Sequence, residues 1–434
     1  MSTYLSVSVS HHVADLERLE QVAVKAAGVR GLQQRLLELG FAEVMVVSTC
    51  SRTELHVVLD PPAGETDVED AAGRLVGLLA GGAGDRPGEG ANDGRGDLAK
   101  FAKVEAGDAA VHQLFRVAAG LDSRVVGEVE IRVQLRAAAR AAVAAKGEPH
   151  RLRGLVAAAL ASAGTAAGTA SGRRGLLAAR AVACALDAVP DPTAIDVVVV
   201  GAGTMGRQIV DALPTGTLAT LLSRTSNSRP GAGPRVDPLE ILPARLHQAD
   251  VVFVATSAGR RIMTADLVSE EMRARDGRRM VIFDLSVPRN VDPGVMATPG
   301  VTLLDLDDLG RGVAGRQVPG GQLSDGLDLA AAEAATGVAA ERYVAGIRSR
   351  AAGPLIVALR SKVEQRCLER LRRQAEPGMP EDTLRRMASA AAGAVAHRPT
   401  VFLREAAAGG DEASMRLVAR VFGLDGDGLA GLDT

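Results

Sequence analysis

The sequence is poor in aromatic residues and in cysteine. Aromatic residues make up 2% of the 434 residues and tryptophan is absent, so stacking of RNA bases on aromatic side chains is not expected. The three cysteines, Cys50, Cys184 and Cys367, lie far apart and form no CxxC pair. They therefore predict neither a disulfide framework nor a zinc site, and the histidine spacings predict no other metal site.

Long apolar runs and an excess of either charge are also missing. The N-terminal segment lacks the basic and apolar regions of a signal peptide, and no stretch of about 18 apolar residues is free of charge. The net charge of −2 neither requires nor excludes an RNA partner. We therefore expect a cytoplasmic protein with reduced thiols that does not associate with a membrane.

The first part of the chain mixes strands and helices, which predicts an α+β domain over residues 1–149. Its predicted strands are residues 4–10, 43–48 and 54–59, and its predicted helices are residues 16–39, 67–79, 108–119 and 130–146. Residues 80–97 are rich in Gly, Asp and Asn, which is typical of a loop.

The rest of the chain changes pattern twice. Residues 150–186 are Ala-rich and predict one long linking helix or two abutting helices. In residues 187–322 short apolar strands alternate with helical stretches, which predicts a parallel sheet. Its predicted strands are residues 194–200, 218–223, 251–255, 280–285 and 301–304. Residues 323–434 are helical, with a break or a new helix at Pro354, and are expected to pack on a partner. The fold class is therefore α/β and multidomain.

A glycine-rich loop follows the buried strand that ends at Val200. Its residues are Gly201, Ala202, Gly203, Thr204, Met205 and Gly206, which form GxGxxG between a strand and a helix. In such loops the first glycine makes the turn, the second lets a pyrophosphate approach the helix N-terminus, and the third lets helix and strand pack closely. The context predicts a dinucleotide site, and the alternative is a degenerate loop that no longer binds.

The next strand ends in Ser223, Arg224 and Thr225, where an NAD site would place an acidic residue. Arg224 instead offers paired donors for a 2′-phosphate. This favours NADPH over NADH as the cofactor. The alternative is that Arg224 is a solvated residue at a strand end.

Cys50 stands between two predicted strands, among small polar residues and one cation. Arg52 offers a charge that would lower the pKa of the thiol and bind a substrate carboxylate. Spacing alone leaves two interpretations open, a nucleophile or a small buried thiol. Cys184 and Cys367 lie in helical stretches and are expected to be structural.

At this point the sequence resembles the glutamyl-tRNA reductase family along its whole length. The resemblance is carried by six ordered segments: residues 48–55 around Cys50, 115–128, the glycine loop 201–206, 283–289, 304–309 and 397–400. It implies a dimer with a catalytic domain, a spinal helix, an NADPH domain and a helical dimerisation domain. It also implies that Cys50 forms a thioester with the glutamate of glutamyl-tRNA, which NADPH reduces to glutamate-1-semialdehyde, the precursor of 5-aminolevulinate.

The resemblance also assigns residues that hold the glutamyl group, and it implies possible partners. The residues are Thr49, Ser51, Arg52, Ser123, Glu128, Val129, Glu130 and Gln134. Glutamyl-tRNA is the implied substrate, a second copy binds through the C-terminal helices, and glutamate-1-semialdehyde aminomutase is a possible docking partner.

Several positions depart from the family pattern. Ser51 replaces an asparagine, and Glu130 replaces a glutamine, so a donor is lost and a negative charge is gained. The family's active-site histidine aligns with Gln113, so the resemblance assigns the catalytic role of this position to His112 or Gln113. His112 is the neighbour of Gln113 on the helix, about 100° away around the axis, and takes the role only if the helix rotates or the register slips. These changes leave two alternatives to a working reductase. One is a catalytically impaired relative that acts by binding, and the other is an NADPH oxidoreductase with an altered acyl substrate.

Overall fold

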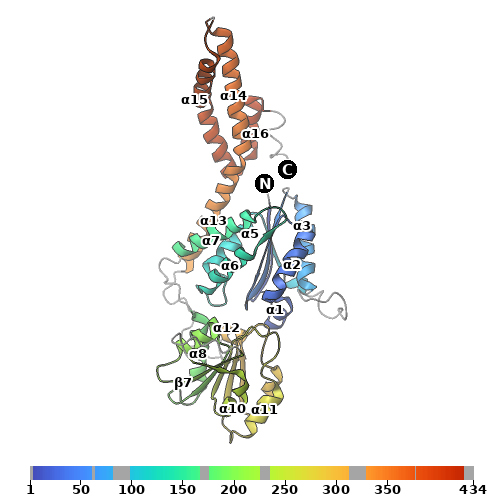
Figure 1. Cartoon of the computed structure of the whole chain (residues 1–434), viewed down its shortest axis with the longest axis vertical. Coiled ribbons are helices and arrows are strands. Elements are labelled where there is room, and N and C mark those ends of the chain that lie inside the picture. Colours follow the sequence, from blue (N-terminus) through green and yellow to red (C-terminus); the bar gives the residue numbers. More distant parts are fainter. Residues whose placement is uncertain are drawn as a thin grey trace.

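The computed structural model describes residues 3–60, 64–81, 98–166, 175–224, 235–311, 329–376 and 378–424. An α+β part occupies the middle of an elongated molecule, a parallel-sheet part lies at one end, and a helical arm extends from the other (Figure 1). The predicted α/β multidomain architecture is therefore confirmed. The domain limits 1–149, 150–186, 187–322 and 323–434 stay a prediction, and most of the predicted loop 80–97 lies outside the described residues.

The N-terminal part is built on a five-stranded sheet with the order β4-β1-β3-β2-β5, in which neighbouring strands are antiparallel. The strands are β1 (Thr3–Ser10), β2 (Glu43–Ser48), β3 (Arg52–Leu59), β4 (Lys103–Ala106) and β5 (Val143–Ala144). Alternate residues of a strand point to opposite faces. Leu5, Val7 and Val9 of β1 accordingly pack into one buried apolar cluster, while Tyr4 packs into another.

Helices cover both faces of this sheet. The helices are α1 (Leu16–Val22), α2 (Ala26–Glu38), α3 (Glu65–Ala80), α5 (Asp108–Ala119), α6 (Glu130–Ala141) and α7 (His150–Ala166), with a short 3₁₀ turn at Ala99–Phe101. Residues of α1, α2 and α3 share the cluster of Leu5, Val7 and Val9. Residues of α5, α6 and α7 share the cluster of Tyr4. The sheet is thus buried on both sides, although it is antiparallel.

The predicted helix 16–39 is wrong in its middle. The chain leaves the helical conformation at Ala23, and a second helix begins at Ala26. The break lets the N–H of Val24 donate to Ser48 Oγ at 3.0 Å, while the Val24 side chain is buried against the sheet. A tertiary hydrogen bond and burial therefore outweigh the local helical pattern.

The predicted helix 130–146 is also too long. It ends at Ala141, and Val143 and Ala144 pair with the edge of β2. The N–H of Ala145 then donates to the carbonyl of Ala42 at 2.9 Å. Extended pairing satisfies the otherwise open edge of β2, a gain that helical periodicity does not reveal.

The linking segment is not one uninterrupted helix. The helix α7 is followed by α8 (Leu176–Ala188), and Gly175, which precedes α8, has a φ of +72°. This left-handed conformation is accessible to glycine but breaks an α-helix. The alternative of two helices is therefore the correct one, and residues 167–174 lie outside the described residues.

The second sheet has six parallel strands in the order β11-β10-β9-β6-β7-β8. The strands are β6 (Asp196–Val200), β7 (Leu218–Ser223), β8 (Val236–Pro238), β9 (Val251–Val254), β10 (Met280–Asp284) and β11 (Val301–Asp305). The helices are α9 (Thr204–Ala212), α10 (Leu242–Leu246), α11 (Ala265–Arg273) and α12 (Leu306–Arg311), with 3₁₀ turns at Leu239–Ile241 and Pro293–Ala297. This strand order is that of a dinucleotide-binding Rossmann fold, whose ligand lies where the order reverses, between β6 and β9. The predicted parallel sheet is confirmed, while β8 was not predicted.

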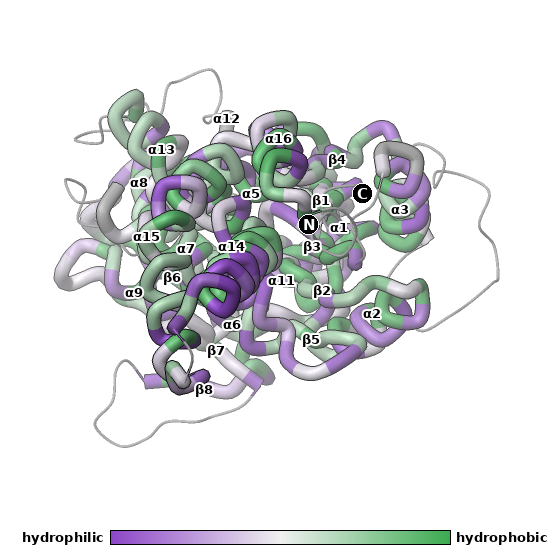
Figure 2. The backbone as a smooth tube through the Cα atoms, turned by 90° about the horizontal axis from the view of Figure 1, so that it is seen from above, coloured by the Kyte–Doolittle hydropathy of each residue, from purple (hydrophilic) through white to green (hydrophobic). Residues whose placement is uncertain are grey.

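The C-terminal arm consists of α13 (Leu329–Ala351), α14 (Gly353–Gln374), α15 (Glu381–Ala408) and α16 (Glu412–Phe422). Pro354 lies in the first turn of α14, so it begins a new helix. The base of the arm is α13, which packs on α5 and α7 (Figure 1). Seen from above, hydrophilic positions are prominent on α14 and apolar positions on α16 (Figure 2). None of the helices in the described part of the chain is long and apolar enough to span a bilayer.

Candidate active site

Cys50 lies in the tight connection between β2 and β3, as the sequence predicted. The N–H of Thr49 donates to the carbonyl of Arg52 at 2.8 Å, and the N–H of Ser51 donates to Thr49 Oγ1 at 3.2 Å. The Cys50 side chain is half-buried and packs against an apolar cluster. That cluster contains Leu16 of the N-terminal part, residues of α8 and one face of the parallel sheet. The thiol therefore lies close to the junction between the N-terminal domain and the domain of the parallel sheet.

The environment of Cys50 favours the protonated thiol. Burial raises the pKa of Cys50 to about 11, and the nearby Glu128 carboxylate adds to the rise. Arg124 and Arg52 act in the opposite direction but do not outweigh these effects. Arg52 does lower the pKa of the thiol, as the sequence predicted, but burial and Glu128 outweigh its effect. Because the thiolate is the nucleophile, a reaction at Cys50 requires a group that accepts the thiol proton.

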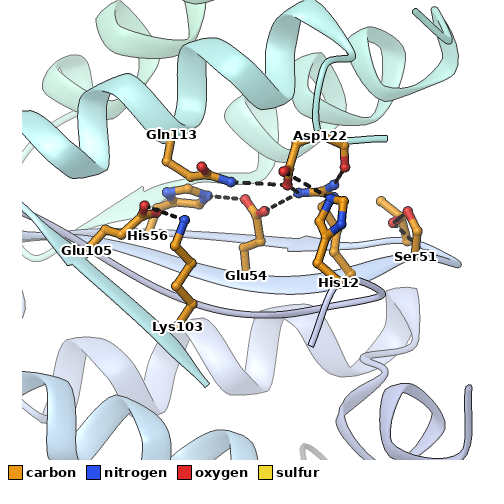
Figure 3. Close-up of polar contacts among 10 residues, drawn as sticks. His12, Ser51, Glu54, His56, Lys103, Glu105, Gln113 and Asp122 are labelled. Carbon is orange, nitrogen blue, oxygen red and sulfur yellow. Dashed lines mark hydrogen bonds and ion pairs between the residues drawn. The ribbon is translucent and has the colours of Figure 1, made fainter. Parts of the chain in front are cut away.

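Arg52 is neutralised by two carboxylates, Glu54 and Asp122. Figure 3 shows these two carboxylates within the polar network between the sheet and the helices above it. Arg52 Nη1 lies 2.8 Å from Glu54 Oε1 and 2.6 Å from Asp122 Oδ2, while Arg52 Nη2 donates to the carbonyl of Asp122. His56 Nε2 lies 2.8 Å from Glu54 Oε2. The Arg52 side chain is 1% exposed. A buried cation with paired, hydrogen-bonded anions fixes the geometry of the loop that carries Cys50.

The network also sets the protonation of its carboxylates. Burial on its own would raise the pKa of Glu54, but the hydrogen bond with His56 and the charge of Arg52 lower it to about 2. Burial likewise opposes ionisation of Asp122, but hydrogen bonds from His12 and Arg52 and the charge of Arg52 hold its pKa well below its usual range. Both carboxylates are therefore anions at neutral pH.

The register of β1 and β3 makes room for this network. Ser6 lies opposite His56, Ser8 opposite Glu54 and Ser10 opposite Arg52. All three serines are buried. Because directly opposed residues share one face of the sheet, each small side chain leaves space for a large polar one.

The structure brings Gln113, and not His112, into this network. Gln113 is buried on α5, and its Nε2 donates to Asp122 Oδ2 at 3.1 Å. His112 is half-buried on a different side of the same helix. The Gln113 amide makes the hydrogen bond with Asp122, but an amide does not take up and return a proton at neutral pH.

The other predicted glutamyl-binding residues are placed unevenly. Ser123 is buried beside Asp122, while Thr49, Ser51, Glu128 and Val129 are half-buried. Burial and repulsion by Glu130 raise the pKa of Glu128 to about 7. Gln134, in contrast, is exposed on α6. Of these residues, Glu128 acts electrostatically on the Cys50 thiol, and Thr49 and Ser51 flank Cys50 in the chain.

Glu130 faces the second domain. Its Oε1 accepts hydrogen bonds from the N–H of Gly175 at 2.9 Å and from Gln208 Nε2 at 2.6 Å. Gly175 precedes α8 and Gln208 lies on α9, so this carboxylate joins α6 to the Rossmann domain. The single acceptor oxygen, more than the negative charge, makes the observed contacts.

We therefore expect Glu130→Ala and Glu130→Gln to behave differently. The alanine variant leaves two donors unpaired at the interface and should lower the free energy of unfolding by about 1–3 kcal/mol. The glutamine variant retains an acceptor oxygen and should lose less than about 1 kcal/mol. Urea denaturation of both proteins measures the difference. Equal losses would mean that the charge itself holds the interface.

A cavity of about 490 Å³ lies at the carboxyl ends of β6, β7 and β9. Its lining includes the predicted cofactor residues Gly201, Ala202, Gly203, Ser223 and Arg224, and also Leu239, Thr256 and Ser257. Thr204, Met205 and Gly206 continue from this loop into α9. Arg224 is exposed at the end of β7, and Thr225 lies outside the described residues.

The glycine loop has the shape that its sequence predicted. Gly201 has a φ of +119°, and a Cβ there would lie 2.2 Å from the Ala255 carbonyl oxygen. A Cβ on Gly206 would lie 1.8 Å from the Gly201 carbonyl oxygen. A Cβ on Gly203 would meet nothing within 4 Å, so open space lies above the start of α9. Two glycines thus permit close packing and the third leaves access for a pyrophosphate, which fits a dinucleotide.

Sequence reasoning missed several residues of the site. The missed residues are Glu54, Asp122, Arg124 and Asp307. Arg124 donates to Asp307 Oδ1 at 2.6 Å, and Asp307 Oδ2 accepts from the N–H of Leu16 at 3.0 Å. The usable signal was the alternation of polar residues along β1 and β3. Within the described residues, no three His, Cys, Asp or Glu side chains gather as a metal site.

Comparison with known proteins decides the family. Models of the glutamyl-tRNAGlu reductase N-terminal domain, of shikimate/quinate 5-dehydrogenase and of the glutamyl-tRNAGlu reductase dimerisation domain match residues 7–168, 183–311 and 331–424. Glutamyl-tRNA reductase 2 of Nocardioides sp. is 37% identical over 425 residues, covering 94% of this chain and 90% of the relative. The chain belongs to the glutamyl-tRNA reductase family.

Other members of the glutamyl-tRNA reductase family match over a similar length. Glutamyl-tRNA reductase 1 of the same Nocardioides strain is 31% identical over 449 residues, covering 97% of this chain and 96% of the relative. The solved structure of glutamyl-tRNA reductase from Methanopyrus kandleri is 23% identical, with a TM-score of 0.41, and covers 98% of this chain and 99% of that chain.

Proposed function

We propose that this protein is an NADPH-dependent glutamyl-tRNA reductase, an oxidoreductase that forms glutamate-1-semialdehyde for 5-aminolevulinate and tetrapyrrole biosynthesis. The observation that carries the proposal is the placement of Cys50. Its thiol packs against the apolar cluster that joins the catalytic part to a Rossmann domain with an intact glycine loop. Membership of the family supports the same reaction.

The chemistry follows from the groups at the site. The Cys50 thiolate attacks the ester carbonyl of glutamyl-tRNA, and the ribose oxygen leaves, which forms a thioester. Bound NADPH would supply the hydride that reduces the thioester to an aldehyde, with the C–S bond breaking and Cys50 leaving as the thiolate. The residues assigned by the resemblance would hold the glutamyl group: Thr49, Ser51, Arg52, Ser123, Glu128 and Val129. Glu130 contacts Gly175 and Gln208, and Gln134 is exposed on α6, so these two are left out of the proposed site. Glu54 and Asp122 take up donors on both Nη atoms of Arg52, whereas its buried Nε has no hydrogen-bond partner among the described residues. A substrate carboxylate would therefore bind the N–H donors of Arg52 that these two residues leave.

The proposed cofactor is NADPH, held by the loop from Gly201 to Gly206 and by Ser223, Arg224 and Thr225. Arg224 is exposed at the rim of the cavity, where a 2′-phosphate would lie. We expect Arg224→Ala to raise the KM for NADPH about tenfold or more, since a charge-assisted hydrogen bond is lost, and to leave the KM for NADH unchanged. Arg273→Ala, an exposed arginine on α11, is the matched control. An equal rise for both cofactors would contradict the role of Arg224.

The proposed assembly is a homodimer through α13, α14, α15 and α16. The match to a dimerisation domain supports it. So do Val357, Val395 and Val421, whose side chains are exposed on these helices. A cytoplasmic location and docking of glutamate-1-semialdehyde aminomutase belong to the same proposal, the latter because a reactive aldehyde favours direct transfer.

Two measurements test the proposed reaction. Protein incubated with glutamyl-tRNA in the absence of NADPH should carry a glutamyl group on Cys50, detectable by mass spectrometry. Addition of NADPH should release glutamate-1-semialdehyde. Absence of both products would sink the proposal and favour a catalytically impaired binding protein. Turnover of a different acyl-tRNA would favour the oxidoreductase with an altered substrate.

A further inference from the structure

The proposed reaction requires a group that accepts the proton of the Cys50 thiol. Four histidines are candidates near the polar network of Arg52, namely His11, His12, His56 and His112. The thiol is protonated at neutral pH because burial raises its pKa to about 11. Gln113 occupies the helix position that reaches Asp122, and its amide is no base. If the protein is an enzyme, another group must therefore carry the proton.

Three of the four histidines are unsuited to this role. His112 lies on another side of α5 than Gln113. His56 is buried, and its Nε2 contacts Glu54 Oε2. Burial, together with the charges of His12, Arg124 and Arg52, lowers the pKa of His11 to about 3, which makes it a weak base.

His12 has the position that the other three lack. Its Nε2 lies 3.2 Å from Asp122 Oδ1, and its side chain is 51% exposed. Asp122 thus contacts His12 with one carboxylate oxygen and Gln113 with the other (Figure 3). The imidazole and the amide lie at two edges of the same carboxylate.

The turn that follows β1 lies against the connection that carries Cys50. Ser10 pairs with Arg52 in the antiparallel register of β1 and β3. The N–H of His11 donates to the carbonyl of Ser51 at 3.0 Å. The chain then turns, because the N–H groups of Val13 and Ala14 both donate to the carbonyl of Ser10. His12 therefore stands in a turn, next to the residue whose backbone contacts the neighbour of Cys50.

We propose that His12 is the proton-transfer residue of this enzyme and replaces the histidine that Gln113 has displaced. Asp122 accepts a hydrogen bond from Nε2 and so fixes the tautomer in which Nδ1 is an acceptor. The imidazole is half-exposed, so a group bound from solvent can reach it. The inference rests on the proposed function and adds a residue to it.

The proton balance of the step is complete. The Cys50 Sγ–H bond breaks as its proton passes to His12 Nδ1, and the thiolate forms an Sγ–C bond with the ester carbonyl carbon. The C–O bond to the tRNA ribose then breaks, and the imidazolium gives its proton to the leaving oxygen. No oxidant or reductant takes part in this half-reaction.

Single-turnover thioester formation on Cys50, measured without NADPH, tests the role of His12. We expect His12→Gln to slow it about 10²-fold or more, as loss of an acid–base group does. His12→Ala should be slow to the same degree and should recover part of its rate when imidazole is added. Recovery by imidazole separates proton transfer from a structural role, because imidazole does not restore packing.

A second variant moves the imidazole within the site. In His12→Gln/Gln113→His, an imidazole returns to the other oxygen of Asp122, and we expect at least a tenfold recovery over His12→Gln. His112→Gln, the same change at a neighbouring position of α5 that does not reach Asp122 in this structure, should react as the wild type does. Equal unfolding midpoints for all variants verify that each protein is folded.

The outcomes separate the two proposals. If the wild type forms the thioester and the His12 variants form it as fast, the inference about His12 is overturned and the reductase stands. A slow His12→Ala protein that neither imidazole nor Gln113→His restores also overturns it. If the wild type itself forms no thioester, the proposed function fails and the role of His12 fails with it.

Discussion

Replacing Cys50 by serine is expected to lower thioester and semialdehyde formation by more than about 10³-fold, as loss of a nucleophile does in other covalent enzymes. A hydroxyl is a far weaker nucleophile than a thiolate, and its ester is a poorer hydride acceptor than a thioester. Serine keeps the size of the side chain, so the half-buried site should retain its packing. Assays of both half-reactions with and without NADPH measure the loss.

Cys367→Ser is the matched control for this experiment. Its thiol lies on α14 in the C-terminal arm, half-buried and remote from the network of Arg52. Wild-type turnover in this variant would assign the effect to Cys50 alone. A Cys50→Ser protein that still released semialdehyde at a comparable rate would rule out the thioester route.

The pH dependence of Cys50 alkylation gives a second test of the state of this thiol. Because burial raises the pKa of the thiol to about 11, its thiolate fraction in the free protein rises about tenfold for each pH unit below that value. Alkylation of Cys50 by iodoacetamide should therefore accelerate steadily from neutral to alkaline pH. A rate that levelled off near pH 7 would show that the thiol is activated before substrate binds.

The cofactor loop was predictable because its determinants are local. A buried strand, three glycines and a helix fall within one continuous segment, and Gly201 and Gly206 meet only neighbours that the Rossmann topology places there. Cys50 was predictable in position for a similar reason, since two strands flank a short connection. Its pKa was not predictable, because Glu128 and Arg124 reach it from elsewhere in the chain.

The polar network was not predicted because its pattern has two meanings. Alternating Ser and Val in β1, and alternating polar and apolar residues in β3, ordinarily indicate a face toward water. Here α5 covers that face, and Gln113 and Asp122 complete the hydrogen bonds of the buried charges. The break at Val24 has the same origin, since its partner Ser48 is remote in sequence. Local periodicity does not reveal hydrogen bonds between residues that are far apart in the sequence.

The second large effect is expected from Arg52→Met, which removes the cation from this network. Glu54 and Asp122 would be left as buried anions without their shared partner. Breaking a buried ion pair in this way typically costs about 3–5 kcal/mol. Urea denaturation at neutral pH should show a loss of this size. Arg52→Met/Glu54→Gln, which also removes one of the stranded charges, should regain part of the stability.

The loss of unfolding free energy in Arg52→Met should depend on pH, and the pKa shifts of Glu54 and Asp122 determine the direction of this dependence. In the wild type the pKa of Glu54 is lowered from 4.5 to about 2, and that of Asp122 is lowered from 3.8. A depressed carboxyl pKa gives stability that is present above the unfolded pKa and is lost as pH falls through the folded one. The contribution is therefore complete at neutral pH and declines below about pH 4.5.

Without Arg52, the carboxyl groups of Glu54 and Asp122 are free to take up protons as the solution becomes acidic. Protonation removes the free-energy cost of burying them as anions. The stability difference between the wild type and Arg52→Met should consequently narrow between pH 7 and about pH 3. Urea titrations at several pH values measure this convergence. Two curves that stayed parallel would mean that Arg52 stabilises the fold through packing, and that its charge does not hold the Cys50 loop.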